Sequence, residues 1–513
     1  MRSTIAILAL ALAGCTTLPP GPAAPKAGSF ALQTPEDTSL GRQFIEESRR
    51  HEGRSGFQII NSGADGLIVR VQLVRAAERT IDMQYYIFRG DPPGILLAEE
   101  LEHAADRGVR VRILVDDGDT VIGDERILAL GTHPNIEVRV FNPFDYRGHN
   151  RLLRHLDFIA HRGRLDYRMH NKLMVVDSSV ALIGGRNIGG QYFQIDPDSQ
   201  FADDDAFAAG AIAPDLSKNF DAYWNSELAV PSTSLRIPRI RPPDSRASLE
   251  HAGIDFQARL ESGEPLRSLI SGADSLEWAT AQIVCDSPDK KGVEERRKRG
   301  RLMAPAVTHV MEQARSELLV VTPYFVPSST EIELLDELLR ENTAVRILSN
   351  SLESAPEIAA QAGYSNFRVP LLEHGAELYE VRALLEDTRG SGQTRKISRY
   401  GTYGLHAKLY IIDRQRFYIG SMNYDQRSWH INTETGLIID SQPLAREMAR
   451  RFDLMVRPQA AYRLSLRPGS HGAIEWRTEV NHQELALSRE PSRGVWQRLK
   501  VRFLSLLPIE REL

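Results

Sequence analysis

Hydrophobic positions along the chain follow two periods, one typical of strands and one typical of helices. Alternating β-branched and aromatic residues over 80–88 predict a strand, and hydrophobic residues at helical spacing predict a helix over 95–105. Further strands are predicted at 109–117 and 136–141. Strands that alternate with a helix in this way predict crossover connections, and hence an α/β fold with a parallel or mixed sheet covered by helices.

The same order of elements returns in the second part of the chain. A strand is predicted at 318–325, a helix at 331–340 and another strand at 345–350. Each part continues into the same motif, His-x-Lys, four residues, Asp, six residues and then Gly-Gly/Ser-x-Asn. The residues that fill the motif are His170, Lys172, Asp177 and Asn187 in the first copy, and His406, Lys408, Asp413 and Asn423 in the second. Because strands recur at nearly equal offsets before each histidine, the repeat covers two whole domains.

The residue types of the motif predict a phosphate site. Side chains two positions apart on a strand point to the same face, so each histidine lies beside its lysine. Two copies offer two imidazoles, two ammonium groups and two carboxamides to one anion. One histidine can attack phosphorus while the other protonates the leaving oxygen, so this chemistry needs no metal or other cofactor. Asp177 and Asp413 fall on odd offsets from the lysines, which predicts a role in local structure although they belong to the motif.

Composition excludes several other classes of protein. Hydrophobic residues make up 42% and charged residues 26%, as in an ordinary globular protein. A formal net charge of −5 offers no general attraction for nucleic acid, and we expect none as a partner. Two cysteines are too few for a disulfide framework or a cysteine-based zinc site.

The first residues resemble a bacterial lipoprotein signal. A short basic start and a compact hydrophobic run precede Leu12-Ala13-Gly14-Cys15, which predicts cleavage after residue 14 and lipid on Cys15. The alternative is an ordinary secretory signal with a chance cysteine. Thr16, rather than Asp, follows the cysteine, so by analogy with lipoprotein sorting we expect the periplasmic side and the outer membrane. No later stretch is long and hydrophobic enough to span a bilayer.

The doubled motif resembles that of the phospholipase D superfamily. Further segments are similar to the bacterial cardiolipin synthases that lack N-terminal membrane spans. These segments are Gly185-Arg186-Asn187-Ile188-Gly189, Phe201-Ala202-Asp203, Phe220-x-x-x-Trp224-Asn225, Asn350-Ser351-Leu352, Asn423-x-Asp425-x-Arg427-Ser428 and Asn432-x-Glu434. The resemblance implies two α-β-α sandwich domains with mixed sheets, packed about a pseudo-two-fold axis around one active site. The expected divisions are a signal peptide at 1–14, a lipidated tether at 15–45, and phospholipase D-like domains at 46–245 and 246–513.

The resemblance also implies a role for each residue of the site. His170 is the expected nucleophile, which forms a phosphatidyl-histidine, and His406 the acid and base. Lys172, Lys408, Asn187 and Asn423 are expected to bind the phosphate oxygens. A carboxylate orients each histidine, and the matching residues are Asp203, with Asp205 as the alternative, and Glu434.

Three functions remain open from the sequence. The first is phosphatidyl transfer at a membrane surface, with phosphatidylglycerol and also phosphatidylethanolamine as substrates. The second is hydrolysis, either of phospholipid to phosphatidic acid or by a secreted phosphodiesterase or nuclease. The third, a lipid-binding lipoprotein with an inactive site, is disfavoured because competent residues fill every motif position. We expect a monomer.

Two further segments each have two interpretations. Residues 495–507 predict an amphipathic helix, which either contacts a membrane surface or docks on the body of the protein. Residues 290–301 predict a basic loop, which either contacts anionic lipid or is solvated.

Overall fold

The computed structural model describes residues 26–507. Gaps fall at 119–124, 147–149, 197–198, 296–298, 384–401 and 471, and between 236 and 275 only residues 262, 266 and 269 are described. Cys15, the predicted signal peptide and the predicted boundary at 245/246 therefore lie outside the described residues. Among the residues that the structure does describe, no helix has the length and hydrophobicity needed to cross a membrane.

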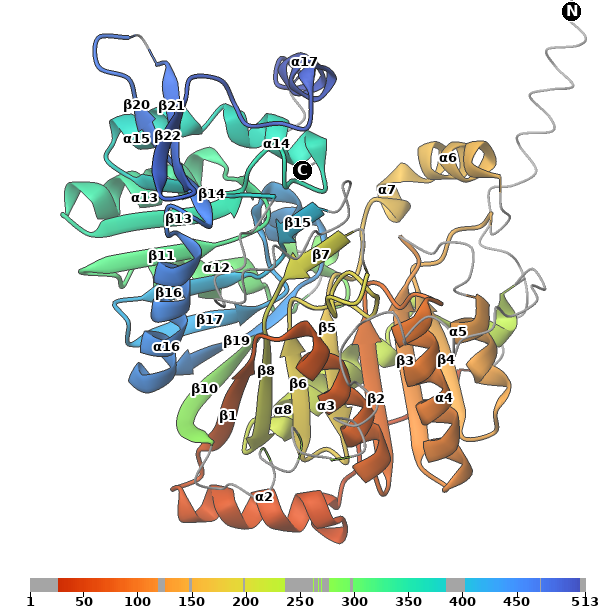
Figure 1. The fold of residues 1–513 in the computed structure, drawn as a ribbon. Coiled ribbons are helices and arrows are strands. Elements are labelled where there is room, and N and C mark those ends of the chain that lie inside the picture. The colour runs from red at the N-terminus through yellow and green to blue at the C-terminus, as the bar shows by residue number, and fades with distance from the viewer. Residues whose placement is uncertain are drawn as a thin grey trace, which may run out of the picture.

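The first half contains a sheet with helices on its faces (Figure 1). Its main elements are α2 (Ser39–Arg50), β1 (Ser55–Ile60), α3 (Gly63–Ala76), β2 (Thr80–Tyr85), α4 (Pro92–Asp106), β3 (Arg110–Asp116), α5 (Glu125–Ala129), β4 (Ile136–Phe141), α6 (Arg151–Ala160), α7 (Arg162–Leu165), β5 (Lys172–Val176), β6 (Val180–Gly184), β7 (Ser199–Ala202), β8 (Asp205–Gly210), α8 (Ala213–Trp224) and β9 (Ala229–Pro231).

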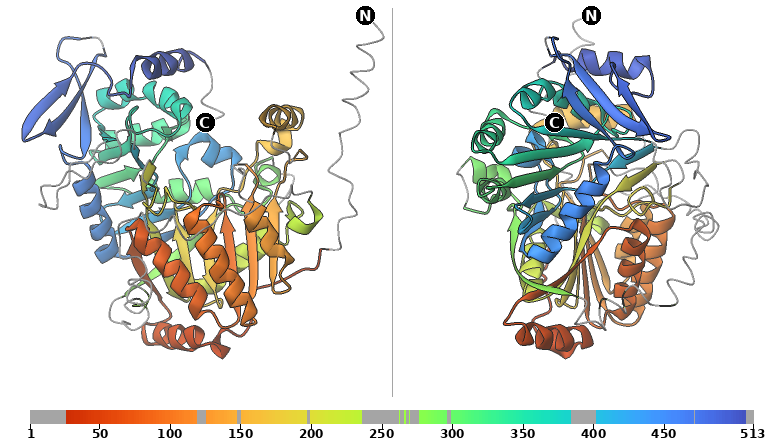
Figure 2. Two further views of the ribbon diagram at one scale, coloured as in Figure 1. Left: turned by 45° about the vertical axis from the view of Figure 1, so that its right-hand side comes forward. Right: turned by 60° about the vertical axis from the view of Figure 1, so that its left-hand side comes forward.

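The second half repeats this plan and adds a C-terminal hairpin and helix (Figure 2). Its main elements are β10 (Glu277–Cys285), α11 (Lys290–Glu294), α12 (Met303–Met311), β11 (Glu317–Val321), β12 (Phe325–Val326), α13 (Ser329–Arg340), β13 (Ala344–Asn350), α14 (Ile358–Ser365), α15 (Arg368–Glu373), β14 (Glu377–Val381), β15 (Thr402–Leu405), β16 (Leu409–Ile412), β17 (Arg416–Gly420), β18 (Tyr424–Asp425), a π-helical segment (Arg427–Ile431), β19 (Thr435–Asp440), α16 (Gln442–Met455), β20 (Ala461–Leu466), β21 (Ile474–Val480), β22 (Gln483–Leu487) and α17 (Val495–Leu504).

The strand order confirms the predicted duplication. In the first half the strands lie in the order β9-β4-β3-β2-β5-β6-β8-β1, and in the second in the order β20-β14-β13-β11-β16-β17-β19-β10. In both halves three central strands are parallel and the others antiparallel, so the predicted mixed α/β sheet is confirmed. His170 precedes β5, which pairs with β2, and His406 precedes β16, which pairs with β11.

One strand joins the two sheets, which the sequence did not predict. The start of β10 pairs with β1, where Ala279 lies opposite Ser55, and the rest pairs with β19, where Thr280 lies opposite Asp440. A single sheet of 18 strands therefore runs through both halves. This continuity fixes the position of one motif relative to the other.

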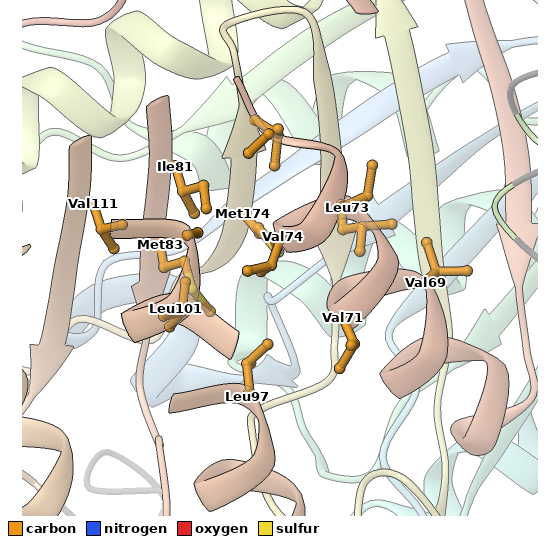
Figure 3. Close-up of a cluster of buried hydrophobic side chains, with 14 of the residues drawn as sticks. Val69, Val71, Leu73, Val74, Ile81, Met83, Leu97, Leu101, Val111 and Met174 are labelled. Carbon is orange, nitrogen blue, oxygen red and sulfur yellow. The ribbon is translucent and has the colours of Figure 1, made fainter. Parts of the chain in front are cut away.

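Three hydrophobic clusters hold the layers together. The first packs α3 and α4 on the outer face of the first sheet, with Leu73, Leu101 and Met174 fully buried (Figure 3). The second contains side chains of both sheets with α8 and α16, among them Leu173 and Leu409. The third packs α12 and α13 on the second sheet. Because the second cluster is shared, burial of hydrophobic area stabilises the contact between the halves as well as each half.

The part of the predicted tether that the structure describes, from residue 26 on, is folded against the first domain. Ala31 N donates to Asp221 Oδ2 at 2.8 Å, and Lys26 Nζ donates to Ala229 O at 2.9 Å. In α2, Leu40 and Phe44 are buried against the first domain. Residues 26–45 are thus folded onto that domain rather than extended as a linker, because the first of them form these hydrogen bonds and α2 buries an apolar face.

Candidate active site

Two short backbone contacts between the halves position the predicted site residues. β7 and β15 pair in parallel and place Ala202 beside Leu405, and His406 N donates to Ala202 O at 2.8 Å. In the symmetry-related position, Met169 forms a bridge with Thr433, and His170 N donates to Thr433 O at 2.9 Å. The next residue after each partner is a carboxylate. Each histidine therefore lies beside an acid from the other half.

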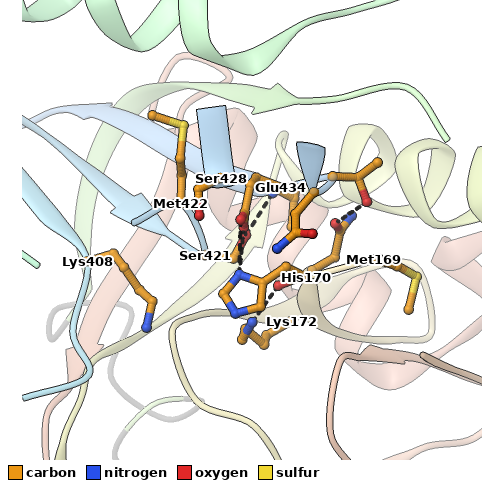
Figure 4. A network of polar contacts seen from close by, with 12 residues as sticks. Met169, His170, Lys172, Lys408, Ser421, Met422, Ser428 and Glu434 are labelled. Atoms are coloured by element: carbon orange, nitrogen blue, oxygen red, sulfur yellow. Dashed lines mark hydrogen bonds and ion pairs between the residues drawn. The ribbon is translucent and has the colours of Figure 1, made fainter. Parts of the chain in front are cut away.

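His170 is oriented by Glu434. His170 Nδ1 lies 3.0 Å from both carboxylate oxygens of Glu434 (Figure 4). Ser421 Oγ donates to Glu434 Oε2 at 2.5 Å, and Glu434 N donates to Asp286 Oδ2 at 3.0 Å. Glu434 and Asp286 are both buried, as is Lys290, whose Nζ lies 3.1 Å from Asp286. Lys290 is therefore part of the packing below the site, so the predicted basic loop is wrong at this residue.

His406 is oriented by Asp203. His406 Nδ1 lies 2.6 Å from Asp203 Oδ2, and Asp204 N donates to Asp203 Oδ1 at 2.8 Å. The alternative acid, Asp205, forms ion pairs with Arg70 and Arg186 at 2.9 and 3.1 Å instead. With Nδ1 held by an acid on both rings, Nε2 is the ring nitrogen left for chemistry, and in His406 it lies 3.2 Å from Lys408 Nζ.

This crossed pairing was not visible in the sequence. Each acid follows its own motif along the chain, so the spacing suggests that it serves the histidine of the same half. The contacts are made instead between residues more than two hundred positions apart. The Phe-Ala-Asp and Asn-Thr-Glu segments indicated the two acids, but which histidine each acid orients depends on how the two halves pair.

The lysines and asparagines lie with the histidines. Lys172 Nζ donates to His170 O at 2.5 Å and lies 5.5 Å from the centre of the Tyr86 ring. Lys408 Nζ donates to His406 O and lies 2.8 Å from His406 Nδ1. Asn187 Oδ1 accepts from Ile87 N at 3.1 Å, whereas its buried Nδ2 has no partner in the structure. Such a buried donor is costly unless a ligand oxygen satisfies it.

A cavity of ≈ 480 Å³ lies between the two motifs; the lysines stand beside the histidines but are not among its lining residues. Its wall includes both histidines and both motif asparagines, and also a pseudo-symmetric pair of tyrosines, Tyr86 and Tyr324. Phe201 and Ala360 add apolar surface. The cavity can hold a phosphodiester and its neighbouring alcohol groups, and the orienting acids Asp203 and Glu434 lie outside its lining, whereas Glu357 and Asp425 form part of it.

Comparison with known proteins identifies the family of this site. The model described as "Cardiolipin synthase, PLD-like domain" matches residues 71–224 and 307–456, one copy in each half. The chain belongs to this phospholipase D-like family. It is 36% identical to "Cardiolipin synthase C" of Escherichia coli (strain K12), over 90% of this chain and 97% of that protein. It is 25% identical to "Major cardiolipin synthase ClsA" of Bacillus subtilis (strain 168), over 79% of this chain and 70% of that protein.

A solved structure has the same fold. The phosphatidylserine synthase of Haemophilus influenzae Rd KW20 superposes with a TM-score of 0.56 and 14% sequence identity, covering 91% of this chain and 99% of that one. Together with the family match, this fold confirms two phospholipase D-like domains around one site. The chain is an enzyme of the phospholipase D superfamily.

Electrostatics in this phospholipase D-like site keep the resting histidines neutral. Burial, followed by the charge of Lys408, lowers the pKa of His406 to about 3, and burial with Lys172 lowers the pKa of His170. Burial lowers the pKa of Lys408 to about 8. The two acids differ, because burial raises the pKa of Glu434 to about 7, while His406 and Lys408 outweigh burial and lower the pKa of Asp203.

An anion in the cavity is expected to reverse the effect on His406. A phosphate offsets the positive charge of the two lysines and favours the imidazolium, so the pKa of His406 should rise from about 3 toward its ordinary value of 6.5. NMR titration of histidine-labelled protein with and without inorganic phosphate measures this shift. The exposed His309 provides the reference resonance. An unchanged His406 pKa at saturating phosphate would contradict a phosphate site between the lysines.

Asp177 and Asp413 occupy equivalent structural positions outside the cavity. Asp177 accepts hydrogen bonds from the backbone N–H groups of Glu78, Arg79 and Thr80 at 2.8–2.9 Å. Asp413 accepts from three successive residues, 315–317, at the start of the corresponding strand. Both aspartates have positive φ, 50° and 52°, in the turn between paired strands. They hold the strand that precedes each site, and neither lines the cavity.

Gly185 leaves room for the acid that orients His406. A Cβ atom added at Gly185 would lie 2.1 Å from Asp203 Oδ1. We therefore expect Gly185→Ala to displace the carboxylate and to lower kcat by on the order of tenfold or more. Gly189→Ala is the control, since its nearest neighbour would lie at 3.5 Å. Equal kcat values for the two variants, measured on folded protein, would show that Asp203 does not depend on this space.

Proposed function

We propose that the chain transfers a phosphatidyl group from one phospholipid to a hydroxyl group of another, through a phosphatidyl-histidine. The observation that carries this proposal is the crossed arrangement, in which each histidine holds Nδ1 on an acid of the other half and both histidines line one cavity. Cardiolipin synthase C and ClsA, whose names state the synthesis of cardiolipin, support the substrate class.

In the first step His170 is the nucleophile. Its Nε2 forms a bond to phosphorus as the bond between phosphorus and the head-group oxygen breaks. His406, protonated once the phosphate is bound, donates its Nε2 proton to that oxygen and releases the head-group alcohol. Lys172, Lys408 and Asn187 stabilise the negative charge on the non-bridging oxygens.

The second step reverses the first with another alcohol. His406, now neutral, removes the proton of the acceptor hydroxyl group, whose oxygen bonds to phosphorus as the bond to His170 Nε2 breaks. With the glycerol head group of phosphatidylglycerol as acceptor, the product is cardiolipin. With water as acceptor, the same intermediate gives phosphatidic acid.

The position of the enzyme in the cell is part of the proposal. We propose that Cys15 carries lipid and anchors the chain on the periplasmic side of a membrane, the outer membrane being the expected one. The support is the sequence around the cysteine, which lies outside the described residues. Incorporation of labelled palmitate into the wild type but not into Cys15→Ser tests the attachment, and fractionation of the membranes tests the location.

Product analysis tests the proposed reaction. Purified enzyme is incubated with labelled phosphatidylglycerol, with and without phosphatidylethanolamine, and the lipids are identified by mass spectrometry. Cardiolipin is the expected product, and a chelator should leave the rate unchanged because the histidines perform the chemistry. Phosphatidic acid alone would assign hydrolysis, and cleavage of DNA without any lipid product would contradict the lipid substrate.

A further inference from the structure

The C-terminal helix α17 exposes a row of hydrophobic side chains. The row consists of Trp496, Leu499 and Phe503, and continues beyond the helix to Leu506. Trp496 is 84% exposed and Leu506 is 83% exposed. With 3.6 residues per turn, Lys500 and Arg502 lie on either side of this row. The opposite side of the helix is docked, because Val501 is buried with Leu352 and Ala362.

Helix α6 in the first half exposes a similar row. Leu152, Leu156 and Ile159 are 65%, 49% and 58% exposed. The other side of α6 is fixed to the domain, where Arg154 lies 4.0 Å from the centre of the Phe144 ring. Such rows are costly in water on a monomeric protein and mark an interaction surface.

Both helices stand next to the active-site cavity. Arg154 of α6 donates to Asp117 O at 2.5 Å, and the next residue, Gly118, lines the cavity. Helix α17 packs on α14, whose Ala359 and Ala360 line the cavity from the second half. In the three views α6 and α17 lie at the same end of the molecule, one on each half (Figures 1 and 2).

We propose that α6 and α17 together dock the enzyme on the surface of an anionic phospholipid bilayer. This inference rests on the proposed function, since the lipid substrates lie in that surface. Charge complementarity favours a bilayer over a protein partner. The two helices contain a single acidic residue, Asp157, and its Oδ2 accepts from Tyr146 N at 2.9 Å. Exposed cations beside a hydrophobic row, as on α17, are the pattern of a helix that lies in a membrane interface.

Vesicle binding tests the proposal without turnover. His170→Ala protein with Cys15→Ser, which removes the predicted lipid anchor, is sedimented with phosphatidylcholine vesicles that contain phosphatidylglycerol. We expect Trp496→Ser with Phe503→Ser, and separately Leu152→Ser with Leu156→Ser, to weaken binding about tenfold or more. Leu485→Ser with Leu454→Ser is the matched control, because these leucines are exposed on other elements, and binding should not change.

Fluorescence provides a second measurement. The other four tryptophans are buried, so a vesicle-induced blue shift and quenching by brominated lipid report on Trp496. Unchanged binding in both helix variants, or a Trp496 emission that vesicles leave unchanged, would overturn the proposal. A double charge reversal, Lys500→Glu with Arg502→Glu, tests the charge on a helix whose hydrophobic residues are retained, and binding should again weaken.

Activity separates this proposal from the proposed function. With His170 restored, the helix variants should retain wild-type turnover of a short-chain phosphatidylglycerol dispersed as monomers, and lose turnover of long-chain lipid in vesicles. If no lipid of either kind reacts but vesicle binding still depends on both helices, the docking stands and the proposed reaction fails. If dispersed lipid reacts and the helix variants act normally on vesicles, the docking fails and the reaction stands.

Discussion

His170→Ala will abolish phosphatidyl transfer, and His406→Ala will trap the covalent intermediate. Loss of the nucleophile leaves no route to the phosphatidyl-histidine, so we expect a fall in kcat of about 10⁴ or more. Loss of His406, the acid and base, should lower kcat by a factor of about 10²–10⁴. The two variants are distinguished by a phosphatidyl ester whose aryl alcohol leaves without protonation. With this substrate the first step survives in His406→Ala, while the second step, which needs a base, stays slow.

Mass spectrometry of the quenched enzyme measures the outcome. We expect the phosphatidyl group on a peptide that contains His170 in the His406→Ala variant, and none in His170→Ala. His309→Ala is the control, because His309 lies on the exposed side of α12. A phosphatidyl group on His406 in the His170→Ala variant would reverse the two roles. Activity of His170→Ala near the wild-type rate would exclude a covalent route through this residue.

Residues with local causes were predictable from the sequence. The strands β3 and β4 have the expected bounds or nearly so, because runs of β-branched residues determine them locally. The role of Asp177 followed from the alternation of side chains on a strand. The doubled motif also indicated two domains around one phosphate site, since neither copy alone supplies both imidazoles.

Features that depend on contacts between the halves were not predictable. The crossing of Glu434 and Asp203 follows from two backbone bridges between segments far apart in the chain, and no local period encodes such bridges. The joining of the sheets through β10 has the same origin. Burial of Lys290 was missed because its neighbours in the sequence are charged, whereas its partners, the carbonyl groups of Ser428 and Asn432, come from the second motif region.

The crossed pairs predict that each acid variant will resemble the variant of the histidine in the other half. Asp203→Asn should behave like His406→Ala, with a trapped intermediate, and Glu434→Gln should behave like His170→Ala, with a slow first step. We expect losses of about 10²–10⁴ in kcat, since an amide no longer holds the ring or stabilises the imidazolium. Asp203→Asn combined with His406→Ala should be no slower than His406→Ala alone, because both changes act through one group.

Asp177→Asn is the matched control for these acid-to-amide changes. It lies in the same motif but outside the cavity, where its carboxylate holds three backbone N–H groups. We expect a loss of about 1–3 kcal/mol in the free energy of unfolding, with kcat per folded molecule unchanged. Thermal unfolding and active-site titration separate these two effects.

Because the two acids differ in pKa, we expect their amide variants to differ in the pH dependence of kcat/KM. Glu434, with a pKa of about 7, becomes protonated as the pH falls below 7, and glutamine resembles this protonated form. The ratio of wild-type kcat/KM to that of Glu434→Gln should therefore decrease toward 1 as the pH falls from 8 to 5.5. Asp203 stays ionised over this range because its pKa is lowered, so the ratio for Asp203→Asn should stay constant. If instead the ratio for Asp203→Asn decreased and the ratio for Glu434→Gln stayed constant, the raised pKa would belong to Asp203 and not to Glu434, which would contradict this prediction.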